Sequence, residues 1–138
     1  MQNYTINHSK NRTFIQVPIT GDPNAINNIA AQVLQQEGYF LSQYNETGLN
    51  ETVWKKGTGM ATAMKYIKLL FQPNMLIISG WTCAGVGSVT VNEMPLNGFV
   101  GAIPKKSCMK SIEKVIAAIQ SVPPQQNYVP QQPQQPQQ

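Results

Sequence analysis

The stretch from Asp22 to Gly38, DPNAINNIAAQVLQQEG, holds the strongest local signal in the chain. Asp22 is a good N-cap residue, and Pro23 fits the first helical position because that position needs no N–H donor. Gly38 stands where a left-handed residue commonly ends a helix. Apolar residues recur between them at helical spacing, at Ile26, Ile29, Ala30, Val33 and Leu34. The stretch therefore predicts one amphipathic helix over residues 22–37, with its Asn and Gln residues largely on the wet side.

Upstream of this helix, residues 13–19 predict a β-strand. Ile15, Val17 and Ile19 alternate with other residues and share one face. Pro18 cannot donate to a sheet ladder, so the strand lies at an edge or ends there. Residues 1–12 are polar and without period, and we expect a flexible N-terminal arm.

Downstream, residues 39–44 and 51–56 predict two strands that flank turn residues at 45–50. Residues 65–71 and 75–81 predict two more strands around Pro73-Asn74, and residues 88–94 are a candidate sixth strand. The segment 95–104 contains Gly and Pro among apolar residues, which predicts a loop folded onto the core. Ser107 is expected to cap a second helix, whose apolar stripe contains Met109, Ile112, Val115, Ile116 and Ile119.

The predicted element order is β-α-β-β-β-β-(β)-α. Strands joined by short turns pair antiparallel, and two amphipathic helices can cover one face of their sheet. The sequence thus predicts a two-layer α+β sandwich, with an antiparallel sheet of five to six strands and two helices on one face. A doubly wound fold is disfavoured because strands and helices do not alternate.

The chain divides into three parts by composition. Residues 13–122 are expected to form one domain, preceded by the arm at 1–12. Residues 123–138 contain eight Gln and five Pro, and almost nothing in them can be buried. Such a segment predicts a disordered tail or linker, and a linker suggests that the domain belongs to a longer, tethered protein.

Composition narrows the functional classes. Charged residues make up only 12% of the chain, and the net charge is +4 with the basic residues spread along it. That pattern is typical of a solvated surface rather than a dense basic patch. The N-terminus has no apolar signal-peptide core, and no apolar run reaches the roughly 18 residues of a membrane span. We expect a cytoplasmic location, or the cytoplasmic face of a membrane if the protein continues into an anchor.

No catalytic or metal-binding set stands out in the sequence. His8, the single histidine, lies in the polar arm, and the six acidic residues include no close pair suited to acid–base chemistry. Cys83 and Cys108 cannot hold a metal by themselves, and we expect free thiols. We therefore expect a protein that is not an enzyme and uses no cofactor or metal.

Three motifs carry a family resemblance. Gly21-Asp22-Pro23-Asn24-Ala25, Val53-Trp54-Lys55-Lys56-Gly57 and the segment NGFVGAIPKK at 97–106 resemble an uncharacterised bacterial domain of low-GC Gram-positive proteins. That domain occurs beside zinc-ribbon or membrane segments and is joined to them by Gln/Pro linkers. The resemblance covers residues 13–120 and implies no known activity. Because this chain lacks paired ribbon cysteines, any metal or membrane role would lie outside it.

Two groups of residues are candidate sites. The first contains Trp54, Lys55, Lys56, Phe99, Lys105 and Lys106. Its last two lysines are expected just before a helix N-terminus, which favours anions. The alternative for this group is that the aromatic rings are core and the lysines are solvated.

The second group is an interface on the uncovered sheet face. Several strands have apolar or aromatic residues in both alternating sets, whereas a water-facing antiparallel sheet alternates more cleanly. We expect a partly apolar patch that includes some of Tyr44, Trp54, Tyr66, Leu70 and Trp81. Such a patch favours self-association or docking of a protein partner.

Two functional hypotheses follow. The first is a non-catalytic binding or adaptor module of unknown specificity. The second is binding of nucleic acid or an anionic ligand through Lys55, Lys56, Lys105, Lys106 and nearby aromatics. Aromatic residues interleaved with basic ones on one sheet face would favour nucleic acid, whereas a polar or self-paired face would favour the adaptor.

Overall fold

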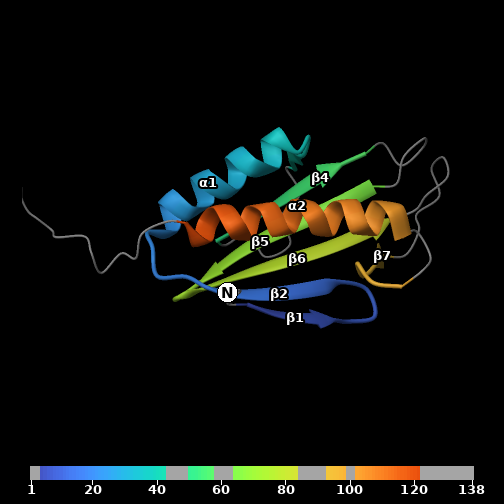
Figure 1. Cartoon of the computed structure of the whole chain (residues 1–138), viewed down its shortest axis with the longest axis horizontal. Helices are drawn as coiled ribbons and strands as arrows, with labels where there is room; N and C mark the ends of the chain where they lie inside the picture. The colour runs from blue at the N-terminus through green and yellow to red at the C-terminus, as the bar shows by residue number, and fades with distance from the viewer. Residues whose placement is uncertain (1–3, 43–49, 58–63, 84–92, 99–101, 122–138) are drawn as a thin grey trace, which may run out of the picture.

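The computed structural model describes residues 4–42, 50–57, 64–83, 93–98 and 102–121. In these ranges two helices pack against one face of a seven-stranded antiparallel sheet (Figure 1). The predicted fold class, an α+β sandwich, is thereby confirmed. The strands run in the order β1 (Thr5–His8), β2 (Thr13–Pro18), β6 (Met75–Cys83), β5 (Met64–Gln72), β4 (Glu51–Lys56) and β3 (Phe40–Leu41), and β7 (Glu93–Met94) pairs with β6. The predicted tail at 123–138 lies outside the described residues.

The first helix, α1 (Pro23–Gln36), begins and ends as its sequence indicates. The Asp22 carboxylate accepts a hydrogen bond from the Asn24 N–H, and Pro23 is the first helical residue. At the other end, Gly38 has a φ of 91°. The N–H groups of Gly38 and Tyr39 then bond the carbonyls of Gln35 and Leu34, which is the Schellman arrangement. The fully buried residues of the helix are Ile26, Ala30 and Leu34.

The second helix, α2 (Ala102–Gln120), begins five residues before the predicted cap at Ser107. Pro104 lies in its first turn, where a missing N–H leaves no helical hydrogen bond unmade. The predicted loop at 95–104 therefore ends earlier than expected, and Lys105 and Lys106 belong to the helix. The buried stripe includes Ile112, Val115, Ile116 and Ile119, as predicted.

The sheet extends further toward the N-terminus than expected. Residues in the predicted flexible arm form β1 (Thr5–His8), which pairs antiparallel with β2 (Thr13–Pro18). The His8 Nδ1 lies 2.8 Å from the Thr13 hydroxyl, which also accepts a hydrogen bond from the Leu96 N–H. The expectation of a free arm was wrong for residues 5–8 because pairing with β2, rather than apolar content, orders them.

The remaining strands follow the predicted positions. They are β3 (Phe40–Leu41), β4 (Glu51–Lys56), β5 (Met64–Gln72), β6 (Met75–Cys83) and β7 (Glu93–Met94). β3 covers two residues of the predicted strand at 39–44, of which residues 43 and 44 lie outside the described residues. The turn between β5 and β6 contains Pro73 and Asn74, whose φ of 60° matches the third residue of a type II turn.

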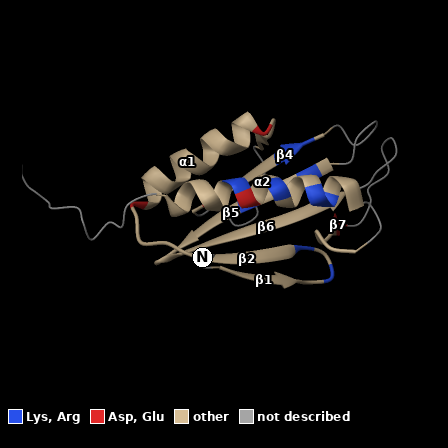
Figure 2. Cartoon of the chain, viewed as in Figure 1, with Lys and Arg blue, Asp and Glu red and all other residues tan. Residues whose placement is uncertain are grey.

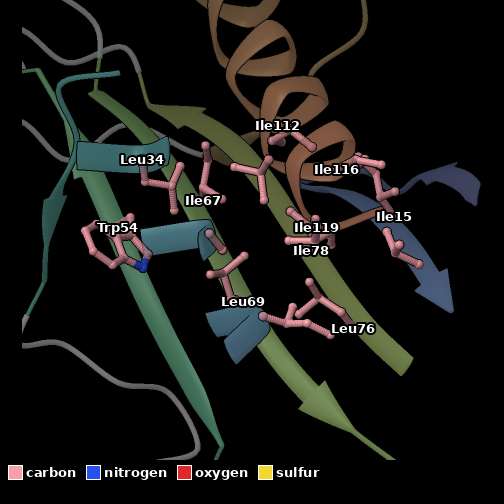
Figure 3. Close-up of a cluster of buried hydrophobic side chains, with 14 of the residues drawn as sticks. Ile15, Leu34, Trp54, Ile67, Leu69, Leu76, Ile78, Ile112, Ile116 and Ile119 are labelled. Atoms are coloured by element: carbon pink, nitrogen blue, oxygen red, sulfur yellow. The ribbon is translucent and has the colours of Figure 1, made fainter. Parts of the chain in front are cut away.

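The core lies between the inner sheet face and the helices (Figure 3). Ile15 from β2, Ile67 from β5 and Ile78 from β6 are fully buried there. They pack in one cluster with Leu34 of α1 and with Ile112, Ile116 and Ile119 of α2. Burying a side chain of this size stabilises the fold by about 1.5–3 kcal/mol.

Gly80 allows α2 to approach β6 closely. A Cβ built at this position would lie 2.6 Å from Leu96 Cδ1 and 2.8 Å from Ile112 Cδ1. Both distances are shorter than van der Waals contact. The absence of a side chain at residue 80 therefore sets how tightly the second helix and the Leu96 segment pack on the sheet.

Candidate binding site

A row of side chains crosses the outer face, which is the sheet face turned away from the helices. Residues opposite each other on neighbouring strands share a face. Trp81 of β6 is opposite Tyr66 of β5, Tyr66 is opposite Lys55 of β4, and Lys55 is opposite Phe40 of β3. Arg12, directly before β2, places its guanidinium 3.6 Å from the centroid of the Trp81 ring. The resulting aromatic row is Arg12, Trp81, Tyr66, Lys55 and Phe40.

The centre of the aromatic row is a stack of two rings. The Tyr66 and Trp81 centroids are 5.2 Å apart, and the ring planes differ by 5°. Such a pair contributes about 0.5–1.5 kcal/mol beyond its buried area, and a cation over the Trp81 ring adds to it. Trp81 is only 3% exposed, whereas Tyr66 is half-buried. Trp81 thus fixes the orientation of the Tyr66 ring, and Tyr66 is the member of the pair that a ligand can reach.

Arg12 is fixed by a two-pronged ion pair. Its Nε donates to Glu93 Oε1 at 2.6 Å, and its Nη2 donates to Glu93 Oε2 at 2.8 Å. A planar guanidinium bound this way has a defined orientation as well as a neutralised charge. Glu93 of β7 is opposite Cys83, the last residue of β6. The ion pair therefore joins the residue before β2 to the C-terminal end of β6.

A pocket of about 290 Å³ opens beside the stack. It is lined by Arg12, Trp81, Tyr66 and Lys55 of the aromatic row, together with Ser42, Cys83 and Glu93. Lys55 is exposed, and no carboxylate of the described residues pairs with it. The pocket therefore combines one aromatic surface with one available cation.

Burial favours the neutral form of two groups in the pocket, the Tyr66 hydroxyl and the Cys83 thiol. It raises the pKa of the Tyr66 hydroxyl, and the nearby Cys83 and Glu93 raise it further. Burial and the Glu93 charge also raise the pKa of the Cys83 thiol, against a smaller opposing effect of Arg12. Since Glu93 balances Arg12, the described lining has one net positive charge at neutral pH, on Lys55.

Only some of the residues predicted for the interface lie on the outer face. Tyr66, Leu70 and Trp81 lie on the outer face, as expected. Trp54 lies on the inner face, 4% exposed and part of the core, so its assignment to the uncovered face was wrong. Its indole Nε1 donates to the Thr52 hydroxyl at 3.1 Å. Tyr44 lies outside the described residues.

The predicted anion site is not assembled by the described residues. Lys55 and Lys56 are successive strand residues and point to opposite faces. Lys56 Nζ donates to the Glu37 carbonyl at 2.6 Å, on the helix side. Lys105 is buried, and its Nζ donates to the Asn97 carbonyl at 2.8 Å. Phe99 lies outside the described residues.

Lys106 is exposed on α2, and its predicted position before the helix is wrong. Figure 2 shows that basic residues also lie along α2. This helix packs on the inner sheet face, whereas the pocket of the aromatic row lies on the outer face. Lys106, Lys110 and Lys114 are exposed on α2. These lysines and Lys55 therefore belong to separate surfaces.

A second pocket of about 250 Å³ lies beside the first turn of α1. Asn24, Asn27, Asn50 and Phe71 are among its lining residues. Asn50 has a φ of 57°, and its carbonyl accepts the Phe71 N–H at 2.9 Å. The lining of this pocket also contains the Glu51 carboxylate, which is paired with Lys68, but its described residues include no cation that could attract an anionic ligand.

Other features of the described residues do not add a site. No group of three or more His, Cys, Asp or Glu residues among them could hold a metal ion. Cys83 and Cys108 are both free thiols. No helix within the described ranges combines the length and hydropathy needed to cross a membrane.

Comparison with protein-family models, curated proteins and solved structures gives no match for this chain. The resemblance to the bacterial domain therefore stays a prediction.

Proposed function

We propose that this domain is a non-catalytic binding module whose ligand docks on the outer face, in the pocket beside Tyr66. The observation that carries the proposal is the supported ring of Tyr66, backed by Trp81 and Arg12, next to the exposed Lys55. A ligand gains most from groups that are already held in place, because little conformational entropy is then lost on binding.

The chemistry of the pocket favours binding over catalysis. Its thiol and phenol have raised pKa values, so neither is an activated nucleophile or base at neutral pH. Its one carboxylate, on Glu93, is held by Arg12. The Gln/Pro-rich residues 123–138 would then link the module to a further segment of a longer protein.

A simple aromatic anion tests this proposal. Naphthalene-2-sulfonate combines a planar ring with one negative charge, and its binding can be mapped by amide chemical shifts in NMR spectra. We expect saturable shifts at Lys55, Tyr66 and Cys83, and Tyr66→Leu should reduce them. Lys106→Gln, on the other layer, is the matched control and should leave them unchanged. Shifts that map to the helices instead would contradict the proposal.

A second candidate function is docking of a protein partner, or of another copy, at the β3 edge. Phe40 is 71% exposed and Leu41 57% exposed on this two-residue edge strand. An edge strand with exposed apolar side chains is a site for pairing or packing with another chain. Light scattering over a wide concentration range would show self-association as a rise in mass that Leu41→Ser abolishes. A constant monomer mass would exclude the second copy.

A further inference from the structure

The aromatic row defines the chemistry of a ligand more narrowly than the pocket alone. Trp81 covers one face of the Tyr66 ring, and the Arg12 guanidinium lies over the Trp81 ring. The next residue of the row is Lys55, one strand away at a spacing of about 4.8 Å. A planar ring placed on the Lys55 side of Tyr66 would extend the existing stack, and the flexible lysine chain can make room for it.

The charges of the pocket specify what the ring should carry. Glu93 neutralises Arg12 through both carboxylate oxygens. Lys55 is left as the cation that an incoming group can reach, and an ammonium acts as a point charge for phosphate or carboxylate. A ring with a neighbouring anion therefore matches Tyr66 and Lys55 together, and a neutral ring matches only Tyr66.

Phe40 extends the pattern by one more position. It is opposite Lys55 in the sheet register, and its 71% exposure leaves it accessible. Across the accessible half of the row, the order is an aromatic ring, a cation and an aromatic ring. The two rings lie two strand spacings apart, about 10 Å. A nucleic-acid strand has this pattern, because its successive bases are attached to sugars that are linked by a phosphate anion.

We propose that the ligand is a single-stranded nucleic acid, with one base stacked on Tyr66, its neighbouring phosphate at Lys55 and the next base against Phe40. This inference rests on the proposed binding function of the same pocket. Aromatic side chains on an exposed sheet face, interleaved with basic residues, bind bases with little dependence on sequence because every base has a π-face. Only two or three nucleotides are contacted, so binding is weak and sequence-tolerant.

The experiment titrates the full chain with a fluorescein-labelled dT10 strand and follows anisotropy. An unlabelled rU10 strand and dTMP compete in parallel arms. We expect dT10 and rU10 to bind, and dTMP to compete at least tenfold less well because it cannot reach both Tyr66 and Phe40. Raising the salt concentration should weaken dT10 binding with a log–log slope of about −0.7 per phosphate contacted, for one or two phosphates.

Variants assign the binding to the aromatic row. Tyr66→Leu should weaken dT10 binding roughly 5- to 150-fold, the range expected for losing one stacked base. Tyr66→Phe keeps the ring and should restore most of the binding that Tyr66→Leu loses, which separates stacking from a general disturbance of the sheet. Lys55→Gln should weaken binding and make the salt slope shallower. Lys106→Gln is the control on the helix layer, and each variant is checked for an unchanged melting temperature.

The outcomes distinguish this inference from the proposed function. The inference is overturned if dT10 does not bind, if Tyr66→Leu binds as well as Tyr66→Phe, or if Lys106→Gln weakens binding as much as Lys55→Gln. If dTMP competes as well as rU10, a mononucleotide is sufficient for binding, and the inference of a strand is also overturned. If naphthalene-2-sulfonate still maps to the pocket in any of these cases, the binding function stands without the nucleic acid.

Discussion

The carboxylate of Glu37, at the end of α1, accepts a hydrogen bond from the hydroxyl of Ser111 on α2 at 2.9 Å. Its other oxygen accepts a hydrogen bond from Lys114 Nζ, also at 2.9 Å. The Glu37 carbonyl accepts from Lys56 of β4. One residue therefore joins both helices and the sheet. These contacts, with that of Lys114 the largest, hold the pKa of the Glu37 carboxyl below its usual range.

This lowered pKa predicts how stability depends on pH. The contribution of Glu37 is fully present above the pKa of the unfolded chain and is lost as the pH falls through the folded pKa. At pH 7 we expect Glu37→Gln to lower the free energy of unfolding by about 1 kcal/mol or less, since Lys114 is largely exposed. Urea unfolding at decreasing pH should show the two proteins converging. A difference that stays constant would contradict the assignment.

The inner face of α1 predicts a graded series of substitutions. Leu34 is fully buried, Val33 is partly buried and Gln35 is exposed. Leu34→Ala should cost about 2–5 kcal/mol through the cavity that it leaves. Val33→Ala should cost less, and Gln35→Ala should change the free energy of unfolding by less than about 0.5 kcal/mol. Chemical denaturation measures all three, and equal costs would mean that the helix face is wrongly assigned.

The contact at Gly80 predicts a strain that a second substitution relieves. Gly80→Ala should destabilise the protein by about 1–3 kcal/mol, because the new Cβ meets Leu96 and Ile112. Ile112→Val removes the Cδ1 atom that lies 2.8 Å from that Cβ. We therefore expect Gly80→Ala to cost less in the Ile112→Val background. If the two substitutions have additive effects on the free energy of unfolding, the contact with Ile112 Cδ1 is not the cause of the destabilisation by Gly80→Ala.

An ion pair on the outer face predicts a large and asymmetric effect. Lys68 Nζ lies 3.3 Å from Glu51 Oε1, and both residues are buried. Glu51→Ala leaves a buried charge without this partner and should cost about 3–5 kcal/mol. The double variant Glu51→Leu with Lys68→Met should cost less than Glu51→Ala alone. If the double variant lowers the free energy of unfolding as much as Glu51→Ala does, the unpaired charge of Lys68 is not the cause of the loss.

The two cysteines should differ in reactivity. Burial raises the pKa of the Cys108 thiol to about 11, whereas Cys83 is half-buried and lines the pocket. N-ethylmaleimide at pH 7.5 should therefore label Cys83 slowly and Cys108 only after unfolding, as followed by mass spectrometry. Naphthalene-2-sulfonate should protect Cys83. If this compound does not change the rate at which Cys83 is labelled, the ligand binds elsewhere.

Sequence alone could predict those elements whose signals are local. Asp22, Pro23 and Gly38 satisfy the ends of α1 within a few residues of chain, so the helix follows from its own stretch. For α2 the sequence predicts a start that is too late, because Ser107 resembles a cap and Pro104 resembles a break. A proline in a first turn is compatible with a helix, and the sequence does not distinguish the two readings.

The candidate site was predictable only in pieces. Lys55, Tyr66 and Trp81 were each singled out, but in two separate groups, because the register that aligns them depends on which strands pair. Arg12 and Glu93 are 81 positions apart, and no local pattern indicates their ion pair. Trp54 and Trp81 occur in similarly apolar strands, so only the structure shows that one faces the core and the other the outer face.

The pairing of β1 with β2 has a practical consequence for anyone who shortens this protein. A version that starts at residue 13, the boundary that composition suggests, would lose an edge strand and with it Arg12. Without Arg12 the Trp81 ring would be in contact with water, and Glu93 would lose its ion-pair partner. Such a truncated protein should emit red-shifted tryptophan fluorescence and offer a ligand a less firmly held Tyr66 ring. The polar first residues of the chain therefore help to fix the C-terminal half of β6, where Trp81 lies.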